Sequence, residues 1–407
     1  MHTPHAAPSP SRLLFLDWLR IGAFALLVLY HVGMYYVSWE FHVKSPHAGP
    51  ALEPWMRLSS PWRLSLLFLI SGAATSFMLQ RDGASGPLLA SRSKRLLWPL
   101  LFGMAVIVPP QSYFEVVQQH GYAGSFFDFM RLYASGYGGF CKGDGRCLIL
   151  PTWNHLWFVA YLFVYTLVLW SLLRLAPRAL EAIAAALARA LRGAALLWLP
   201  ITVLALLRLA LVDRYPATHA LVGDWYLHAT YLGVFIVGAA WARDPAAWQR
   251  CAEMRWPAGV AALAAWGVML ALSTWVFGTP QQAHWLWLGR AAFAAMQWSA
   301  IVCALGFAKV HLNSDHRWRA TLAECVFPVY IVHQTLLIAF AMALAPLRWP
   351  AALEGPLLVA LTFSASLAAY FAVRRVSWLR PWFGLTAPAA PPVAAPAALQ
   401  VADRSAR

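Results

Sequence analysis

The chain has 407 residues, of which 61% are hydrophobic and only 12% are charged. A soluble domain carries about 25% charged residues, so this composition excludes an ordinary soluble protein. The formal net charge of +15 does not indicate nucleic-acid binding, because the Lys and Arg residues lie between apolar runs and are not interleaved with exposed aromatics.

Ten apolar segments follow one another along the chain, each near the length that a helix needs to cross a bilayer. Because a segment inside lipid must satisfy its own backbone hydrogen bonds, we expect each to be a helix. The sequence therefore predicts one all-α, polytopic membrane domain of about 10 transmembrane helices over residues 1–380. The expected spans are residues 13–36, 62–80, 95–115, 154–175, 194–212, 225–242, 257–277, 286–308, 326–345 and 352–373.

Basic residues alternate between the loops on the two sides of these spans. With the N-terminus in the cytoplasm, 20 of the 31 Lys and Arg residues fall in cytoplasmic segments. The positive-inside rule then selects an N-in/C-in orientation. Pro99, Pro109 and Pro110 interrupt the third span, where we expect the helix to bend or break.

Two segments outside the spans have compositions of their own. The tail, residues 381–407, is rich in Pro and Ala from Thr386 onwards, and we expect it to be disordered in the cytoplasm. The outer loop, residues 116–153, contains Cys141 and Cys147, which either form a disulfide in an oxidising space or remain two free thiols. No His/Cys spacing typical of a metal site occurs, so we expect no metal.

Three ionisable side chains lie within the first span. Asp17 and Arg20 are one helical turn apart and close enough to pair. Arg20 and His31, eleven residues apart, lie within roughly 20° of one helix face and about 16 Å apart along the axis. Such groups face a protein interior or an aqueous cavity, because lipid would cost several kcal/mol.

A histidine titrates near neutrality, so His31 can take a proton from a hydroxyl and return it. Two other interpretations stay open at this point. The Asp17–Arg20 pair could be merely structural, and His31 could be a hydrogen-bonded histidine of the core.

Further polar groups in other spans could surround His31. The motif FLISG of the second span contains Ser71, and its small residues let helices approach closely. The motif WNHLWF at the start of the fourth span contains His155 and Trp157. In the ninth span, VYIVH places Tyr330 and His333 one turn apart on one helix face.

Arg92 and Arg95 precede the third span in the motif SRSKRLLWP, and they share a helix face if that helix begins early. Such a pair can bind phosphates, although ordinary inside-positive flanking charge is the alternative. A cavity with a basic cytoplasmic mouth and a histidine nearer the outside suits a charged donor from one side and a hydroxyl acceptor from the other.

A cavity that receives a donor and an acceptor predicts an enzyme that transfers a group between them. The alternative function is a membrane transporter or exporter of a sugar or acylated substrate. Transporters often contain internal repeats and paired broken helices. Here proline interrupts chiefly the third span, with no evident counterpart in the second half of the chain. This asymmetry favours an enzyme.

The ordered set of motifs resembles the acyltransferase-3 family of membrane O-acyltransferases. The matching motifs are Arg20-x10-His31, FLISG, Arg92-x-x-Arg95, HLWF from His155 to Phe158, and Tyr330-x-x-His333. Within the family, the stretches FLDWLR, YHVGMYY and WEFHVKS are similar to the branch of periplasmic glucan succinyltransferases that contains the glucans biosynthesis protein C.

The resemblance implies a multi-pass protein of the bacterial inner (cytoplasmic) membrane with ten core helices. It also implies acyl-CoA, of the succinyl type, as the cytoplasmic donor and a periplasmic glucan or other polysaccharide as the acceptor. On this resemblance His31 is the base, and Arg20, held by Asp17, lines the donor channel or orients the thioester. Arg92 and Arg95 would bind the phosphates of coenzyme A.

The resemblance also implies roles in substrate positioning or oxyanion stabilisation for Ser71, His155, Trp157, Tyr330 and His333. No permanently bound cofactor is expected, because acyl-CoA is a substrate. Direct transfer needs no protein nucleophile, and an acyl-enzyme on Ser71 or a histidine is the alternative. A succinyl carboxylate would need a further cationic partner, for which Arg208 and Arg290 are equal candidates.

Overall fold

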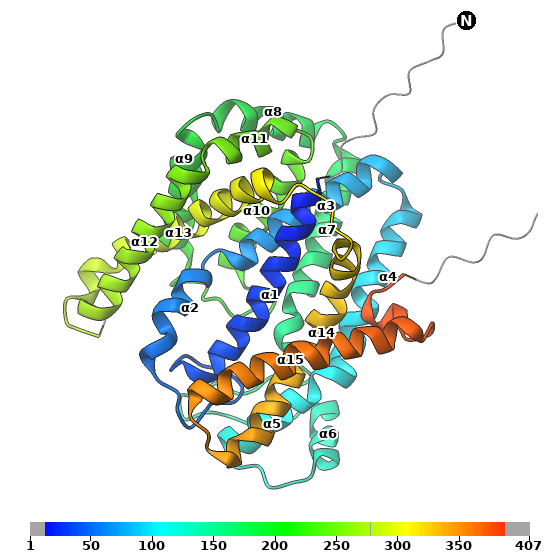
Figure 1. Cartoon of the computed structure of the whole chain (residues 1–407), viewed down its shortest axis with the longest axis vertical. Coiled ribbons are helices and arrows are strands. Elements are labelled where there is room, and N and C mark those ends of the chain that lie inside the picture. The colour runs from blue at the N-terminus through cyan, green and yellow to red at the C-terminus, as the bar shows by residue number, and fades with distance from the viewer. Residues whose placement is uncertain (1–12, 277, 387–407) are drawn as a thin grey trace, which may run out of the picture.

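The computed structural model describes residues 13–276 and 278–386 (Figure 1). Within these residues every regular element is a helix, and the only β-pairing is an isolated bridge between Cys141 and Cys147. The longer helices are α1 (Leu14–Tyr36), α2 (Glu53–Ser59), α3 (Arg63–Asp82), α4 (Gly86–Phe102), α5 (Pro109–His120), α6 (Phe126–Ser135), α7 (Trp157–Leu175), α8 (Ala179–Ala190), α9 (Ala195–Leu211), α10 (Trp225–Trp241), α11 (Pro245–Glu253), α12 (Arg255–Trp275), α13 (Gln282–His311), α14 (Arg319–Leu344) and α15 (Ala351–Arg375). The short helical turns are η1 (Pro50–Leu52), η2 (Gly103–Ile107), η3 (Asn154–Leu156), η4 (Ala345–Leu347) and η5 (Arg380–Phe383).

The expected fold class, an all-α polytopic membrane protein, is confirmed. In the described part of the chain eight helical segments are long and apolar enough to cross a membrane, or nine if α8 and α9, bent by 114°, count as one span. The remaining expected span is α10, whose 17 residues make a helix about 25 Å long, slightly shorter than the ~30 Å hydrocarbon core. Apart from Thr386, the Pro/Ala-rich part of the tail lies outside the described residues.

The break expected in the third span lies between α4 and α5. Helix α4 continues through Pro99, a π-helical turn (η2) follows, and α5 starts at Pro109. Pro at the first position of a helix is favourable, because its missing N–H would have no intrahelical partner there. Helix α4 begins early, at Gly86, with the Ser85 hydroxyl as its N-cap, so Arg92 and Arg95 are both helical.

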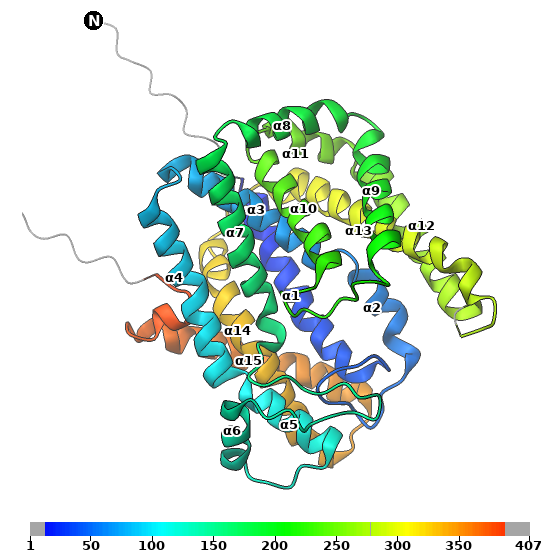
Figure 2. The same cartoon turned by 180° about the vertical axis from the view of Figure 1, so that it is seen from behind.

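The helices surround α1, which runs through the middle of the molecule in both views (Figures 1 and 2). Helices α8 and α11 lie at one end, and α5 and α6 lie at the other. Helices α12 and α13 pack against each other, and their connected ends project from the body as an arm.

Small residues bring α3 and α10 together. A Cβ atom on Gly72 would lie 1.9 Å from the Phe235 carbonyl oxygen, and one on Gly238 would lie 2.0 Å from the Leu69 carbonyl oxygen. Both obstacles are backbone atoms, which cannot rotate away as a side chain can. The prediction that the FLISG motif permits close helix packing is therefore confirmed.

Cys141 and Cys147 form a disulfide, which decides between the two alternatives left open by the sequence. Within the loop that it closes, Arg146 and Lys142 pair with Glu40 at 2.7 and 3.3 Å. The hydrogen bonds from Arg146 hold the pKa of the Glu40 carboxyl below its ordinary value. The disulfide loop is thus joined to the segment that follows α1.

Candidate active site

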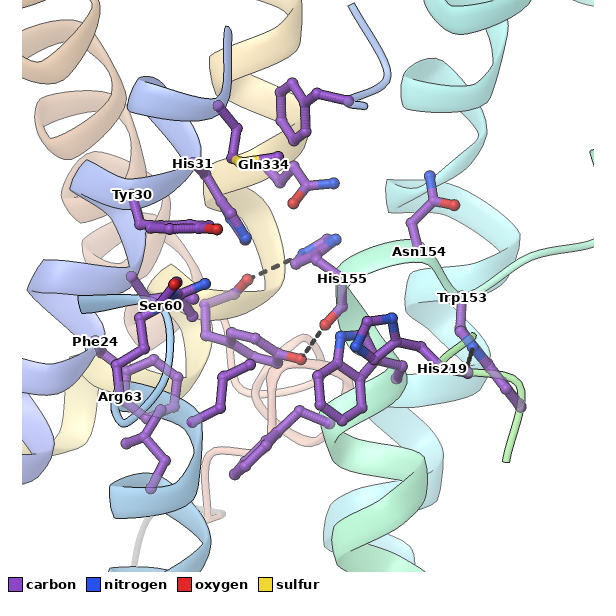
Figure 3. A pocket seen from close by; sticks show the side chains of 18 of the residues that line it. Phe24, Tyr30, His31, Ser60, Arg63, Trp153, Asn154, His155, His219 and Gln334 are labelled. Carbon is purple, nitrogen blue, oxygen red and sulfur yellow. Dashed lines mark hydrogen bonds between the residues drawn. The ribbon is translucent and has the colours of Figure 1, made fainter. Parts of the chain in front are cut away.

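A cavity of about 500 Å³ lies between α1, α3, α7, α10 and α14 (Figure 3). His31 points into it from α1, and His155 and Asn154 lie on the opposite wall. Aromatic rings form much of the lining, namely those of Phe24, Tyr30, Phe41, Trp153, Trp157, Phe158, Tyr231 and Tyr330.

His31 is hydrogen-bonded to a second histidine behind the cavity wall. Its Nδ1 atom lies 2.8 Å from Nε2 of His333, whose own Nδ1 lies 2.7 Å from the Tyr330 carbonyl oxygen. A carbonyl oxygen only accepts, so His333 donates from Nδ1 and its Nε2 carries the lone pair. His31 must then donate from Nδ1, which leaves the lone pair on its Nε2 atom.

The Tyr330 carbonyl also fixes His155, which is buried. His155 donates from Nε2 to the carbonyl oxygens of Tyr330 and Ile331, both at 3.1 Å. In return the Tyr330 hydroxyl donates to the His155 carbonyl oxygen at 2.5 Å. These bonds join η3 to α14, so one turn of α14 orients His155 directly and His31 through His333.

Gln111, in the first turn of α5, uses every hydrogen-bonding position of its amide. It donates to His155 Nδ1 at 3.3 Å and to Thr335 Oγ1 at 2.6 Å. It accepts from Asn154 Nδ2 at 3.1 Å and from Gln334 Nε2 at 3.0 Å. The side chain is fully buried, so the break before α5 places a polar link between α5, η3 and α14.

A second set of charges lies toward the N-terminal end of α1. Asp17 pairs with Arg20 at 3.5 Å, as predicted, and more closely with Arg319 at 2.6 Å. Arg20 also donates to the Ala323 carbonyl oxygen at 3.3 Å. Asp17 therefore joins the start of α1 to the start of α14.

Arg92 and Arg95 belong to the same basic region. Arg92 lies within electrostatic range of Arg95 and Arg20. Arg95 donates from Nε to the Gly384 carbonyl oxygen at 3.1 Å, whereas the buried Nε of Arg92 has no hydrogen-bond partner. Three guanidinium groups are thus close together, with donor capacity in excess of the protein's own acceptors.

A family model, Acyl_transf_3, described as an acyltransferase domain, matches residues 13–373. The chain belongs to the acyltransferase-3 family. Because it also has membrane-spanning helices, the protein is a membrane acyltransferase. No curated protein and no solved structure matches the chain significantly.

The structure of this acyltransferase brings some of the residues selected from the sequence to the cavity and leaves the others away from it. His31, His155, Trp157 and Tyr330 line the cavity, and His333 supports His31 from behind. The other candidates, Asp17, Arg20, Ser71, Arg92 and Arg95, do not line this cavity. Among the described residues no group of three or more His, Cys, Asp or Glu could hold a metal ion.

Two buried polar residues at the cavity of the acyltransferase, Gln111 and Arg63, are not among the residues predicted from the sequence. Gln111 follows Pro109 and Pro110 inside an apolar span, and an amide at that position was a usable signal. Arg63 lines the cavity, although in the sequence it is only a charge at the outer end of the second expected span. Whether the Arg63 side chain reaches the cavity depends on the angle between α3 and α1, and the local sequence does not predict that angle.

Two further histidines lie at the cavity of the acyltransferase. His42 lines it, and its Nδ1 lies 2.5 Å from an oxygen of Glu115. His219, in the loop between α9 and α10, packs on the Trp157 ring with 4.2 Å between ring centroids. Burial lowers the pKa of His219 below its ordinary value, so its ring is uncharged at neutral pH.

Proposed function

We propose that this acyltransferase moves a succinyl group from cytoplasmic succinyl-CoA to a hydroxyl of a periplasmic glucan or related glycan. The observation that carries the proposal is the hydrogen bond from His31 to His333 at the wall of a cavity lined by aromatic rings. The proposal places the protein in the inner membrane of a bacterium, with both termini in the cytoplasm.

In this mechanism His31 is the general base. His333 holds the His31 ring so that Nε2, which carries the lone pair, is available to a substrate in the cavity. A buried histidine that orients a second histidine through a fixed tautomer resembles the base–orienter arrangement of acyl-transfer enzymes. The Tyr330 carbonyl fixes the arrangement at its far end.

The reaction balances without a protein nucleophile. The acceptor hydroxyl attacks the thioester carbonyl carbon while its proton passes to His31 Nε2. The carbon–sulfur bond then breaks, and His31 returns the proton to the departing thiolate of coenzyme A. The products are an ester and free coenzyme A.

Two observations support the two-sided supply of substrates. Arg20, Arg92 and Arg95 provide the excess of guanidinium donors that phosphate groups of coenzyme A require. The loops at the cavity, which contain Phe41, Trp153 and His219, are outside in the N-in orientation, where the glycan acceptor would arrive. Aromatic rings at this mouth suit the apolar faces of sugar rings.

Activity of the purified protein tests the proposal. With succinyl-CoA and a glucan, the free thiol of coenzyme A and the mass of the glycan are measured. His31→Ala should lower kcat/KM by about 10²–10⁴-fold, as expected for a lost general base. His333→Ala should lower it less, because the base remains but its orienting partner is lost.

His42→Ala is the comparison variant, since His42 lines the same cavity with its own carboxylate partner. Full activity of His31→Ala together with loss of activity in His42→Ala would contradict the proposal. The general base would then be His42, with Glu115 as its hydrogen-bond partner. A folded wild-type protein that consumes no acyl-CoA but exports a sugar or acylated substrate from vesicles would favour the transporter alternative.

A further inference from the structure

Arg63 is a buried cation on the same wall of the cavity as His31 (Figure 3). It is the first residue of α3, and only 5% of it is exposed. Its guanidinium carbon lies 3.3 Å from the centroid of the Tyr30 ring. A cation over an aromatic face is stabilised, but the ring does not neutralise the charge.

The protein leaves part of this guanidinium group without partners. The Nε and Nη1 atoms of Arg63 are buried and have no hydrogen-bond acceptor. No Asp or Glu occurs among the described residues that line the cavity. A buried cation without a counter-ion is unfavourable, so an anion in the cavity would offset a charge that no carboxylate of the lining neutralises.

Arg208 and Arg290, the candidates named from the sequence for a succinyl carboxylate, lie elsewhere. They line a separate cavity of about 310 Å³. Arg290 is paired with Asp213 at 2.5 Å, and Arg208 donates to the Tyr226 hydroxyl at 2.6 Å. Neither lines the cavity that contains His31.

We propose that Arg63 is the receptor for a carboxylate carried by the substrate, so that the cavity selects a dicarboxylic acyl group or an acidic sugar. The inference rests on the proposed function, because it assumes that acyl transfer takes place beside His31. The two sources of the carboxylate, the far end of the acyl chain and the acceptor glycan, share the same recognition chemistry.

A bound carboxylate also assists His31. Arg63 is close enough for its charge to act on the His31 ring, and it opposes the positive charge that the ring gains when it accepts a proton. A carboxylate on Arg63 offsets this repulsion at the step that needs it. Substrates with a carboxylate should therefore have a higher kcat as well as a lower KM.

The test compares succinyl-CoA with butyryl-CoA, which has the same number of acyl carbons and no carboxylate. The wild type should prefer succinyl-CoA by about tenfold or more in kcat/KM, because a site built for a polar group rejects the analogue that lacks it. Arg63→Gln should abolish this preference by lowering kcat/KM for succinyl-CoA, and Arg63→Lys should retain part of it. Arg57→Gln, which removes an outer arginine outside this cavity, should keep the wild-type preference.

A second arm uses butyryl-CoA with a neutral glucan and with a glycan that contains an acidic sugar. A preference for the acidic glycan that disappears in Arg63→Gln assigns the carboxylate to the acceptor. A wild-type protein with neither preference, or a preference that survives in folded Arg63→Gln, overturns the inference.

Failure of the proposed function is distinguished by a binding measurement. If the wild type turns over no acyl-CoA, thermal unfolding in sodium butyrate and in neutral butyramide, at equal ionic strength, still tests Arg63. Stabilisation by butyrate alone, present in the wild type and absent in Arg63→Gln, supports the carboxylate receptor. Equal Tm values in butyrate and in butyramide overturn it.

Discussion

Lys44 shows how one residue outside the spans fixes the helix that carries the proposed base. Its ammonium group donates to the carbonyl oxygens of Met34 and Val37 at 2.7 and 2.6 Å. The last carbonyls of a helix have no intrahelical partners, and a cation near them is favourable. Lys44 therefore caps the end of α1, five residues beyond His31.

We predict that Lys44 loses its proton at an unusually low pH. Burial lowers its pKa from 10.5 to about 8. Between these values the folded protein has released a proton that the unfolded chain still binds, so the free energy of unfolding should rise with pH across that window. Acylation of Lys44 by acetic anhydride, quantified by mass spectrometry across pH, should reach half its maximum near pH 8.

A half-maximum near pH 10, the ordinary range of a lysine, would contradict this prediction. Met34→Ala is a suitable comparison variant, because it keeps the backbone carbonyl that Lys44 contacts and should leave the labelling profile unchanged.

The sequence predicted the charged residues of α1 better than their surroundings. Helical periodicity places Asp17 beside Arg20, and the pair is present. The same periodicity contains no information on Arg319, 299 residues after Arg20, which is the closer partner of Asp17. Contacts between distant segments depend on the packing of α1 against α14, so local spacing could not give them.

At the scale of helices, the contact between α3 and α10 is set by glycine backbones. We predict that Gly238→Ala destabilises the protein by roughly 1–3 kcal/mol, the usual effect of overpacking, because the new methyl group meets the Leu69 carbonyl at 2.0 Å. Thermal unfolding in detergent should give a lowered Tm.

Gly233→Ala is the matched control on the same helix. A Cβ atom there has nothing within 4 Å, and alanine is a better helix former than glycine. The control should therefore keep or slightly raise the Tm. An unchanged Tm in Gly238→Ala would mean that α3 and α10 separate without cost.

The prolines of the third span predicted a break but not its form. Pro99 is accommodated within α4, whereas the chain changes course at η2 and α5 begins at Pro109. The position of the break matters because it directs Gln111 toward η3 and α14. Which of several prolines ends a helix depends on neighbouring helices, since they can re-satisfy the freed backbone groups.

At the scale of the whole molecule, the orientation in the membrane decides which substrate meets which end. Helix α13 provides a direct test, because its two flanking loops contain the exposed residues Gln281 and Ser314. In the N-in/C-in orientation Gln281 lies outside and Ser314 in the cytoplasm.

We predict that an impermeant maleimide labels Gln281→Cys in sealed right-side-out vesicles, in a background where Cys251, Cys303 and Cys325 are replaced by Ala. Ser314→Cys should react only after the vesicles are opened. The reverse pattern would show that the protein has the opposite orientation in the membrane. The sides assigned to donor and acceptor would then be exchanged.

The fold class followed from composition and apolar length alone, because lipid permits few backbone structures. The cavity did not follow, since its wall combines α1, α3, α7, α10 and α14 with loops between them. Family motifs selected two of the four histidines that line it, His31 and His155, and only the assembled helices added Arg63 to its wall and Gln111 behind His155.

The four hydrogen bonds of Gln111 have a consequence for the way the site responds to acidity. A carboxamide neither gains nor loses a proton in the range where imidazoles change charge. The scaffold behind His155 therefore keeps the same donors and acceptors while His31 gains and loses a proton at Nε2. Catalysis can depend steeply on pH in such a protein without any rearrangement of the wall that holds the substrate.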